Sequence, residues 1–170
     1  VDYVQLREVL INSVDHKGVL YIRFARKEIP KVYDEDYKFN FNKADVLKEG
    51  KDITIFSTGI MVKGALEASE ILEREGINAE VISVPIIKPI DEDTITKSLI
   101  KTKKAVTVEN HNIIGGLYSA VCEVACKNSP TLIRGIGIKD HFGEVGSIKF
   151  LIEKYKMTPQ DIVNECKNLI

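Results

Sequence analysis

Two polar clusters in the second half of the chain carry side chains that can move protons. Glu109 and His111 follow the apolar run AVTV, and Asp140, His141 and Glu144 follow a second apolar run. A carboxylate beside an imidazole is a common general acid–base pair, and histidine is also a metal ligand. The carboxyl ends of parallel strands meet at one edge of a sheet, so both clusters are expected there. Three roles remain open for the first cluster: a structural histidine, a contact between subunits, or catalysis. The second cluster could form part of a site or a polar contact between subunits.

Two further motifs could bind an anion. Arg26 ends the segment VLYIRFAR, and a planar guanidinium there can bind carboxylate or phosphate through paired donors. An exposed salt bridge is the alternative. The tripeptide Ser57-Thr58-Gly59 ends one predicted strand and opens a helix, where backbone N–H groups can cradle a phosphate. It matches neither GxGxxG nor GxxxxGK[ST], so a tight turn that requires glycine is the other interpretation.

The three cysteines, Cys122, Cys126 and Cys166, fall on helical patterns. Cys122 and Cys126 share a helix face, and the alternatives are a metal pair or two small buried side chains. No other His/Cys group in the sequence has metal-ligand spacing, so no metal site is predicted. An odd number of cysteines on helices indicates reduced thiols and a cytoplasmic setting.

Composition excludes several classes of protein. The chain has 170 residues with 24 Lys and Arg against 25 Asp and Glu, a net charge of -1. This charge gives no electrostatic attraction to nucleic acid or to an anionic membrane. No apolar run reaches the roughly 18 residues of a transmembrane helix, and the start lacks a signal-peptide pattern. The length leaves room for one domain, or one domain plus a fragment, and a hydrophobic content of 44% is enough for a core.

Strands and helices alternate from residue 51 onward. Apolar runs predict strands at 53–56, 79–84, 105–108 and 131–136. Helices are predicted between and after these strands, with N-caps at Asp91, Ser147 and Thr158 and a C′ glycine at Gly76. Residues 109–112 are predicted to form a polar turn, from which Gly115-Gly116 leads into a helix. This alternation predicts a three-layer α/β/α sandwich with a mostly parallel sheet.

The first 50 residues are patterned differently. Residues 2–16 predict a helix with a stripe of Tyr3, Leu6, Leu10 and Val14, ended by Gly18, and residues 19–25 predict a strand. One helix and one strand cannot bury both faces of a sheet, so residues 1–30 are expected to be the tail of a larger domain. Residues 31–50 are expected to be an extended linker over a surface, with a short edge strand near 44–47. This linker is the expected first site of limited proteolysis, and residues 51–170 form the second domain.

Several stretches in order resemble the transketolase family. They are IRFARKEIP, ADVLKEGKDITIFSTGIMVKGALEASEILEREGINAEVISVPIIKPID, TVENHNIIGGLYSAV and GIKDHFGEVG. The resemblance covers essentially the whole chain and is closest to the short split-type C-terminal subunit. It implies that residues 1–30 are the last helix and strand of the pyrimidine-binding domain. It also implies that residues 51–170 are the family's C-terminal domain, a five-stranded mixed sheet with one antiparallel strand.

The resemblance also implies a function. Transketolases of the pentose phosphate pathway move a two-carbon ketol unit between sugar phosphates, using thiamine diphosphate and a divalent metal (Mg or Ca). The family's cofactor and metal sites fall outside this chain, so no catalytic residue and no bound cofactor are expected here, and the isolated chain is expected to be inactive. The family's strand-end arginine contacts the sugar phosphate, and Arg26 in Ala25-Arg26-Lys27 matches it. The expected partner is a second copy in a homodimer, or an N-terminal thiamine-diphosphate-binding section in a heterotetramer.

The resemblance leaves the polar loops as candidates for an interface or the edge of a site. These residues are Glu109, His111, Gly115, Gly116, Asp140, His141 and Glu144. Tyr118 stands where GGxGSA has glycine, Asn110 where VEEH has an acid, and Val145 where FGESG has serine. The last two departures weaken an acid–base role for these loops.

Two relatives and one other class of protein compete with this interpretation. 1-Deoxyxylulose-5-phosphate synthase shares the KPLD and VEE…GGxGS patterns, and the β subunits of 2-oxoacid dehydrogenases share the SxGxMVxEALEAAE style of helix. The DHFGEVG loop is closer to transketolase than to either. A non-catalytic interaction domain that completes a dimer is the alternative from a different class.

Overall fold

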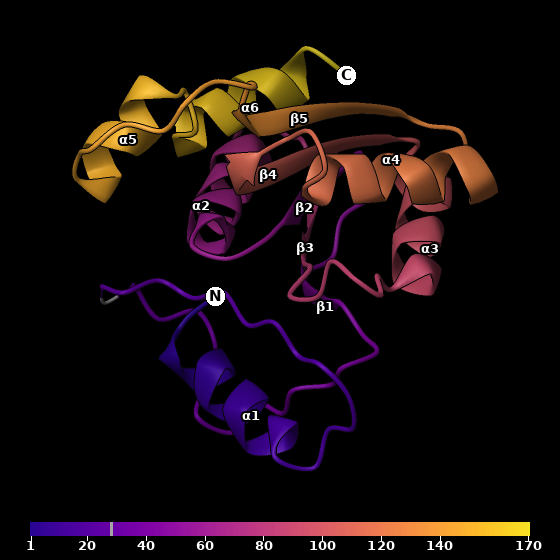
Figure 1. Ribbon diagram of the computed structural model, residues 1–170. Coiled ribbons are helices and arrows are strands. Elements are labelled where there is room, and N and C mark those ends of the chain that lie inside the picture. The colour runs from indigo at the N-terminus through magenta and orange to yellow at the C-terminus, as the bar shows by residue number, and fades with distance from the viewer. Residues whose placement is uncertain (28) are drawn as a thin grey trace.

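The computed structural model describes residues 1–27 and 29–170, and a five-stranded sheet lies at its centre between two layers of helices (Figure 1). A separate N-terminal segment with its own helix lies below the sheet in that view. The elements in chain order are α1 (Tyr3–Ser13), β1 (Asp45–Lys48), β2 (Ile53–Ser57), α2 (Met61–Arg74), β3 (Ala79–Ser83), α3 (Glu92–Thr102), β4 (Lys104–Asn112), α4 (Leu117–Asn128), β5 (Leu132–Ile138), α5 (Ile148–Lys154) and α6 (Pro159–Lys167). The predicted α/β sandwich is confirmed.

The sheet has the strand order β1-β3-β2-β4-β5. The last four strands of this order run parallel, whereas β1 pairs antiparallel with β3 at one edge. Every residue of β2 is buried, because helices cover both faces of the sheet. The expected short edge strand is thus present, although it belongs to the sheet rather than to a free linker.

Each face of the sheet packs against its own pair of helices. On one face α2 and α6 cover a core that includes Ile55, Val81, Val106, Leu72 and Ile162. On the other face α3 and α4 cover a core that includes Phe56, Ile82, Leu99, Leu117 and Val121. None of the α5 side chains is buried, and Ile152 packs partly buried against the first core.

Local signals set the helix ends as predicted. The Asp91 side chain accepts a hydrogen bond from the Thr94 N–H, and Thr158 forms a capping box at the start of α6. Gly76 adopts φ +84°, and the N–H of Ile77 bonds to the Leu72 carbonyl at 3.0 Å. This bond completes a Schellman ending for α2.

The predictions for the N-terminal segment need correction. The helix ends at Ser13, five residues before Gly18, and residues 19–25 are not a strand. A ladder needs a neighbouring strand, and within the described residues no strand pairs with this segment. Its apolar side chains are therefore in solvent, with Val19 99% and Tyr21 85% exposed.

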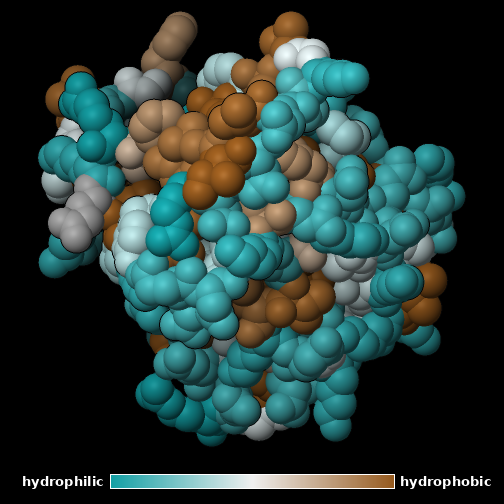
Figure 2. Space-filling view, turned by 90° about the horizontal axis from the view of Figure 1, so that it is seen from below, coloured by the Kyte–Doolittle hydropathy of each residue, from teal (hydrophilic) through white to brown (hydrophobic). Residues whose placement is uncertain are grey.

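The stripe predicted on α1 also faces solvent. Tyr3 and Leu10 are about half exposed, and Val14 is 80% exposed. Figure 2 views the molecule from the side of α1 and shows patches of apolar surface among hydrophilic atoms. The opposite face of α1 contacts the following segment mainly through polar groups.

Residues 31–45 are a packed segment. The Asp2 carboxylate accepts hydrogen bonds from the Val32 and Tyr33 N–H groups at 2.6 and 2.8 Å. The hydroxyls of Tyr33 and Tyr37 donate to Asp45 at 2.7 and 2.8 Å. These bonds join α1 to the start of β1, so the predicted linker is anchored at both ends.

No helix among the described residues combines the length and apolar character needed to cross a membrane.

Candidate functional site

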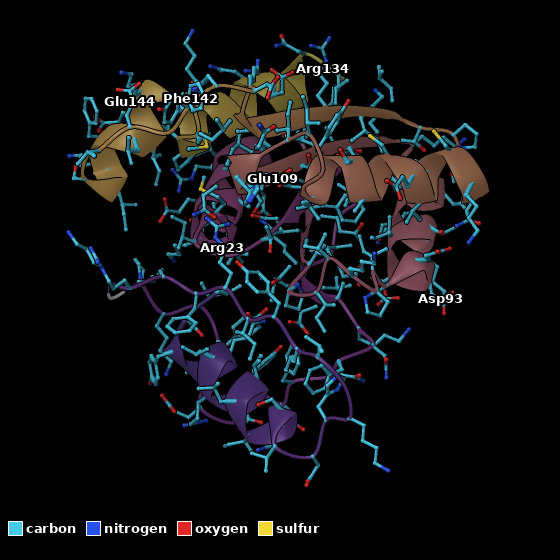
Figure 3. All side chains as sticks on the ribbon, viewed as in Figure 1. Arg23, Asp93, Glu109, Arg134, Phe142 and Glu144 are labelled. Atoms are coloured by element: carbon cyan, nitrogen blue, oxygen red, sulfur yellow. The ribbon has the colours of Figure 1, made fainter. Side chains whose placement is uncertain are left out.

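The loops after β4 and β5 meet at one edge of the sheet, as predicted. The N–H of Ile113 bonds to the Ile138 carbonyl at 3.0 Å, and the Asn112 amide donates to Asp140 at 3.4 Å. Figure 3 shows Glu109 at the end of β4 and Phe142 and Glu144 in the loop that leads to α5. The two polar clusters of the sequence are therefore neighbours.

Glu109 lies inside the fold. The predicted polar turn at 109–112 is the end of β4, and the Glu109 side chain is almost fully buried. Its two carboxylate oxygens accept hydrogen bonds from the backbone N–H groups of Leu117 and Tyr118, both at 2.8 Å. These are the first N–H groups of α4, so Glu109 caps the positive end of this helix from the neighbouring strand.

Burial dominates the electrostatics of this carboxylate. Removal from water raises the pKa of Glu109 above its usual value. The two backbone N–H bonds oppose this pKa shift, as do the charges of His111 and Arg23. Both oxygens accept bonds in the cap, and the side chain is 1% exposed, so a substrate cannot reach the carboxylate.

The glycine pair that follows makes room for this cap. Gly115 adopts φ +78°, a backbone conformation that glycine accommodates most easily. A Cβ on Gly116 would lie 2.1 Å from a Glu109 carboxylate oxygen and 2.5 Å from the Asn112 carbonyl oxygen. Glu109 and the two glycines are therefore one structural unit.

His111 lies outside this unit. Its ring is exposed, and Nδ1 lies 3.3 Å from the Asn112 carbonyl oxygen. No hydrogen bond joins it to the Glu109 side chain in the described part of the chain. The structure therefore does not form the acid–base pair that the sequence suggested.

The loop after β5 is tied to α5. The Glu144 carboxylate pairs with Lys154 at 2.5 Å and accepts from the Tyr155 hydroxyl at 3.3 Å. The His141 ring packs against Tyr155, with centroids 4.9 Å apart. Between these contacts Phe142 and Val145 are essentially fully exposed, at 98% and 103%. The loop thus presents two apolar side chains to solvent.

Arg23 is a residue that the sequence analysis missed. Its guanidinium donates to the Asn110 carbonyl at 3.3 Å, across 87 residues of sequence. This bond holds the exposed N-terminal segment against the end of β4 (Figure 3). Arg26, three residues later, is exposed at a bend of the same segment. No local pattern links positions 23 and 110, so no sequence signal could have found this contact.

The tripeptide Ser57-Thr58-Gly59 connects the ends of β2 and β4. The Thr58 N–H bonds to the Val108 carbonyl at 3.2 Å, and Gly59 has φ +59°. A Cβ on Gly59 would stand 3.4 Å from the Asn110 side-chain oxygen. These contacts support the interpretation of a tight turn. They also lie at the topological switch point between β2 and β4, where open α/β sheets bind ligands.

The described residues contain no group of three or more His, Cys, Asp or Glu side chains that could hold a metal ion. Cys126 is exposed and Cys122 only half-buried, so the prediction of two buried cysteines on α4 holds for neither.

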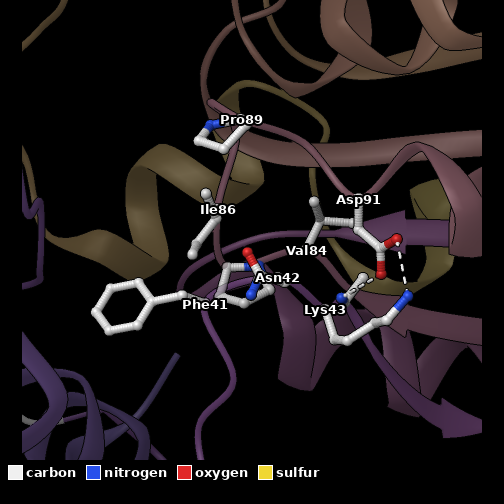
Figure 4. A pocket seen from close by; sticks show the side chains of 9 residues that line it. Phe41, Asn42, Lys43, Val84, Ile86, Pro89 and Asp91 are labelled. Carbon is white, nitrogen blue, oxygen red and sulfur yellow. Dashed lines mark hydrogen bonds and ion pairs between the residues drawn. The ribbon is translucent and has the colours of Figure 1, made fainter. Parts of the chain in front are cut away.

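The described surface includes two hollows of very different size. One, beside the ion pair of Lys43 and Asp91, has a volume of about 10 Å³ and suits no more than a single water (Figure 4). The other is a groove of about 540 Å³ between β5 and the two helices after it.

Comparison with known proteins gives a consistent result. Residues 42–162 match the family model described as transketolase, C-terminal domain. A 6-deoxy-6-sulfo-D-fructose transketolase subunit from Clostridium sp. (strain MSTE9) is 44% identical over 163 residues, which cover 96% of this chain and 51% of that protein. A putative transketolase C-terminal section from Methanocaldococcus jannaschii is 40% identical over 95% of this chain and 51% of its own length.

A more distant relative and a solved structure extend the comparison. A 1-deoxy-D-xylulose-5-phosphate synthase from Heliobacterium modesticaldum is 32% identical over 99% of this chain but only 26% of its own length. A structure titled "Split gene transketolase, inactive beta4 tetramer" superposes with a TM-score of 0.95 and 40% identity, covering 99% of this chain and 55% of that one. The chain spans about half the length of the first curated relatives that it matches.

Proposed function

Because the chain belongs to the transketolase family through its C-terminal domain, we propose that it is the C-terminal section of a split-type enzyme that transfers a two-carbon ketol unit between sugar phosphates. The observation that carries the proposal is the extent of the likeness. Identity of 40% or more runs over at least 95% of the chain, and so includes the exposed N-terminal segment that precedes the family match.

The proposed domain organisation follows from this likeness. Residues 1–30 would be the tail of the pyrimidine-binding domain and residues 51–170 the C-terminal domain. Residues 31–50 would connect them, although β1 and the family match from residue 42 extend the second domain into this connection.

Arg26 is the proposed contact for the phosphate of the sugar. A guanidinium at an exposed bend can reach a dianion outside the fold, and its planar fork suits phosphate. Arg23 supports this role, because its bond to Asn110 places the segment at the carboxyl edge of the sheet. Binding energy at the remote phosphate can then be used to position the reacting carbonyl.

Thiamine diphosphate and its divalent metal do not fit the residues of this chain. The described residues offer no cluster of metal ligands, and the buried Glu109 carboxylate is occupied by the cap of α4. The described residues therefore supply no ligand set for the cofactor. We propose that an N-terminal section holds it, and that this chain is inactive alone.

The proposed setting is a multi-subunit cytoplasmic enzyme. The relative from Clostridium is named as a subunit, and the solved structure is titled as a tetramer. The exposed apolar stripe of α1 and the tips Phe142 and Val145 are surfaces that a partner would cover. In this proposal the loops at 109–116 and 140–146 contribute to subunit contact.

A second candidate is the terminal part of a 1-deoxyxylulose-5-phosphate synthase, favoured by the 32% identity to such an enzyme. The test is to reconstitute the chain with an N-terminal thiamine-diphosphate-binding section and to assay the products. Ketol transfer between sugar phosphates supports the first proposal, and formation of 1-deoxyxylulose 5-phosphate supports the second. Saturable binding of thiamine diphosphate by the isolated chain in calorimetry would contradict the division of roles.

A further inference from the structure

The cysteine pair on α4 is not explained by packing. The sequence left two roles open for Cys122 and Cys126, a metal pair or two small buried side chains. The structure removes the second role, because Cys126 is exposed and Cys122 is only half-buried. Cys166 on α6, by contrast, is fully buried in the core and serves packing. Two thiols at the surface, in no disulfide, therefore remain without a role.

The two thiols are neighbours on one face of α4. The helix runs from Leu117 to Asn128, so side chains four residues apart lie one above the other, with Cβ atoms about 5–6 Å apart. Tyr118, one turn before Cys122, lies against β5, where a Cβ on Gly135 would stand 2.9 Å from its ring. Cys122 packs at the edge of the core, and Cys126 reaches solvent one turn later. A metal ion can therefore approach the pair from the solvent side.

The spacing favours a bridging ion over a disulfide. A disulfide needs Cβ atoms roughly 3.5–4.5 Å apart, which is shorter than the separation of residues four apart in a helix. The pKa of the Cys122 thiol is raised, first by burial and also by the neighbouring Cys126. A thiol with a raised pKa is a poor nucleophile, so disulfide exchange at Cys122 is slow. A metal ion placed between the two sulfur atoms spans the wider gap and displaces the thiol protons.

The number of ligands selects the kind of ion. Structural zinc sites almost always have four ligands, and iron–sulfur clusters are likewise held by about four. The described residues contain no group of three or more His, Cys, Asp or Glu side chains that could hold a metal ion. Thiolates are soft ligands that favour Cu(I), and this monovalent ion accepts two sulfur ligands. The pair therefore meets the coordination demand of Cu(I) without a third residue.

We propose that Cys122 and Cys126 form a two-thiolate site for a soft monovalent metal ion, and that Cu(I) is the ion it fits. Binding forms two metal–sulfur bonds and releases two protons to solvent, with no change of oxidation state. The bound ion closes a bridge across the C-terminal half of α4. The inference is independent of the proposed ketol transfer, because it uses neither Arg26 nor an N-terminal section.

The test is an anaerobic competition titration of the reduced chain with Cu(I) held by bathocuproine disulfonate, whose absorbance reports the Cu(I) that it loses. The wild-type chain should withdraw one equivalent of Cu(I). Cys122→Ser and Cys126→Ser should each weaken binding by about a hundredfold or more, because one of the two metal–sulfur bonds is lost. Since two protons leave, the apparent affinity should rise roughly a hundredfold per pH unit below the pKa of the thiols.

Two controls separate this site from other thiol chemistry. Cys166→Ala removes the buried thiol and should leave Cu(I) binding unchanged. Cys126→Ser combined with Lys127→Cys keeps three thiols in the chain but turns one of them away from Cys122 around the helix, so it should bind as weakly as Cys126→Ser alone. The exposed ion pair of Lys127 with Glu92 contributes little to stability, and circular dichroism melting shows whether each variant is folded. The shifted pair changes no core residue, so it decides the question if Cys166→Ala does not fold.

Several results would overturn the proposal. One is a wild-type chain that withdraws no Cu(I) from the chelator. Others are binding at wild-type strength in either serine variant or in the shifted pair, or weakened binding in a folded Cys166→Ala chain. A rise of only tenfold per pH unit would indicate a single thiolate, and so would also contradict the two-thiolate site.

Discussion

Replacing Gly116 with alanine should be among the most damaging single-methyl changes in this chain. The added Cβ would lie 2.1 Å from the Glu109 carboxylate oxygen and 2.5 Å from a backbone carbonyl oxygen, and carbon atoms do not approach that closely. Glu109 is 1% exposed, so its side chain has no free volume into which it could retreat. The carboxylate must therefore leave the N-terminus of α4.

The magnitude follows from the bonds that are lost. The carboxylate accepts two backbone N–H groups at 2.8 Å, and a hydrogen bond to a charged group contributes roughly 1.5–3 kcal/mol. A buried charge left without these partners adds a further penalty. We expect Gly116→Ala to lower the free energy of unfolding by about 3–5 kcal/mol, which is a large part of a typical domain's stability of roughly 5–15 kcal/mol.

Gly115 provides the matched control. It has φ +78°, and a Cβ placed there would meet no atom within 4 Å. Gly115→Ala should therefore cost only the backbone strain of about 1–2 kcal/mol. Urea unfolding followed by circular dichroism measures both variants, and a loss at Gly116 no larger than that at Gly115 would refute the steric argument.

A double-mutant cycle identifies the group that clashes. In a Glu109→Ala background the carboxylate is gone, so Gly116→Ala should cost much less than in the wild type. The coupling energy between the two positions should exceed about 1 kcal/mol, well above the scatter expected for independent sites. Additive effects would mean that the Asn112 carbonyl, and not the carboxylate, sets the requirement for glycine.

Three further outcomes are expected. Burial raises the pKa of Glu109 in the folded chain, so ionisation of this side chain destabilises the fold. The free energy of unfolding should therefore fall as pH rises from about 4.5 through the folded pKa. Glu109→Gln should abolish this pH dependence, measured by urea unfolding at several pH values. Arg26→Ala in the reconstituted enzyme should raise KM for phosphorylated sugars roughly tenfold to a hundredfold, because one charge-assisted hydrogen bond is lost. KM for a non-phosphorylated donor such as hydroxypyruvate should change much less. Equal effects on both substrates would show that Arg26 maintains the fold. Trypsin should cut first in the exposed segment, after Lys17, Arg23 or Lys27, rather than within the anchored residues 31–45. Mass spectrometry of the early fragments identifies the first cuts. First cuts after Lys38 or Lys43 would contradict the anchoring of residues 31–45.

The last of these outcomes differs from what the sequence alone suggested. Residues 31–50 are polar and aromatic without a helical period, and so look like a free linker. Their tyrosines instead meet Asp45 and Gln5 in a shared hydrogen-bond network. Such contacts join positions 8–40 residues apart, and no local pattern encodes them.

The sandwich itself was predictable because its signals are local. Apolar runs of four to six residues mark the buried strands, and the caps at Asp91 and Thr158 depend on residues within one turn. The strand predicted at 19–25 and the turn predicted at 109–112 both failed because pairing with a distant neighbour is not encoded in the local sequence. Residues 19–25 have strand-like side chains but no neighbour to pair with in the described chain. Residues 109–112 look like a turn but form the end of β4, where Asn112 pairs with Ile138 after an irregular stretch of the register. Residue type decides neither case; the availability of a partner does.

The same distinction applies to the chemistry of the chain. Glu109 has the type and the position of a general base, at the carboxyl end of a central parallel strand. A base must have a lone pair that a substrate can reach, and this carboxylate is 1% exposed and holds the first N–H groups of α4 inside the core. His111 and the tips of the loop after β5 are accessible at this edge, and Arg26 is exposed on the segment that Arg23 ties to Asn110. We infer that this chain contributes surface and substrate contacts to a larger enzyme, while the buried acid that looks most catalytic serves to hold the helix on which those contacts depend.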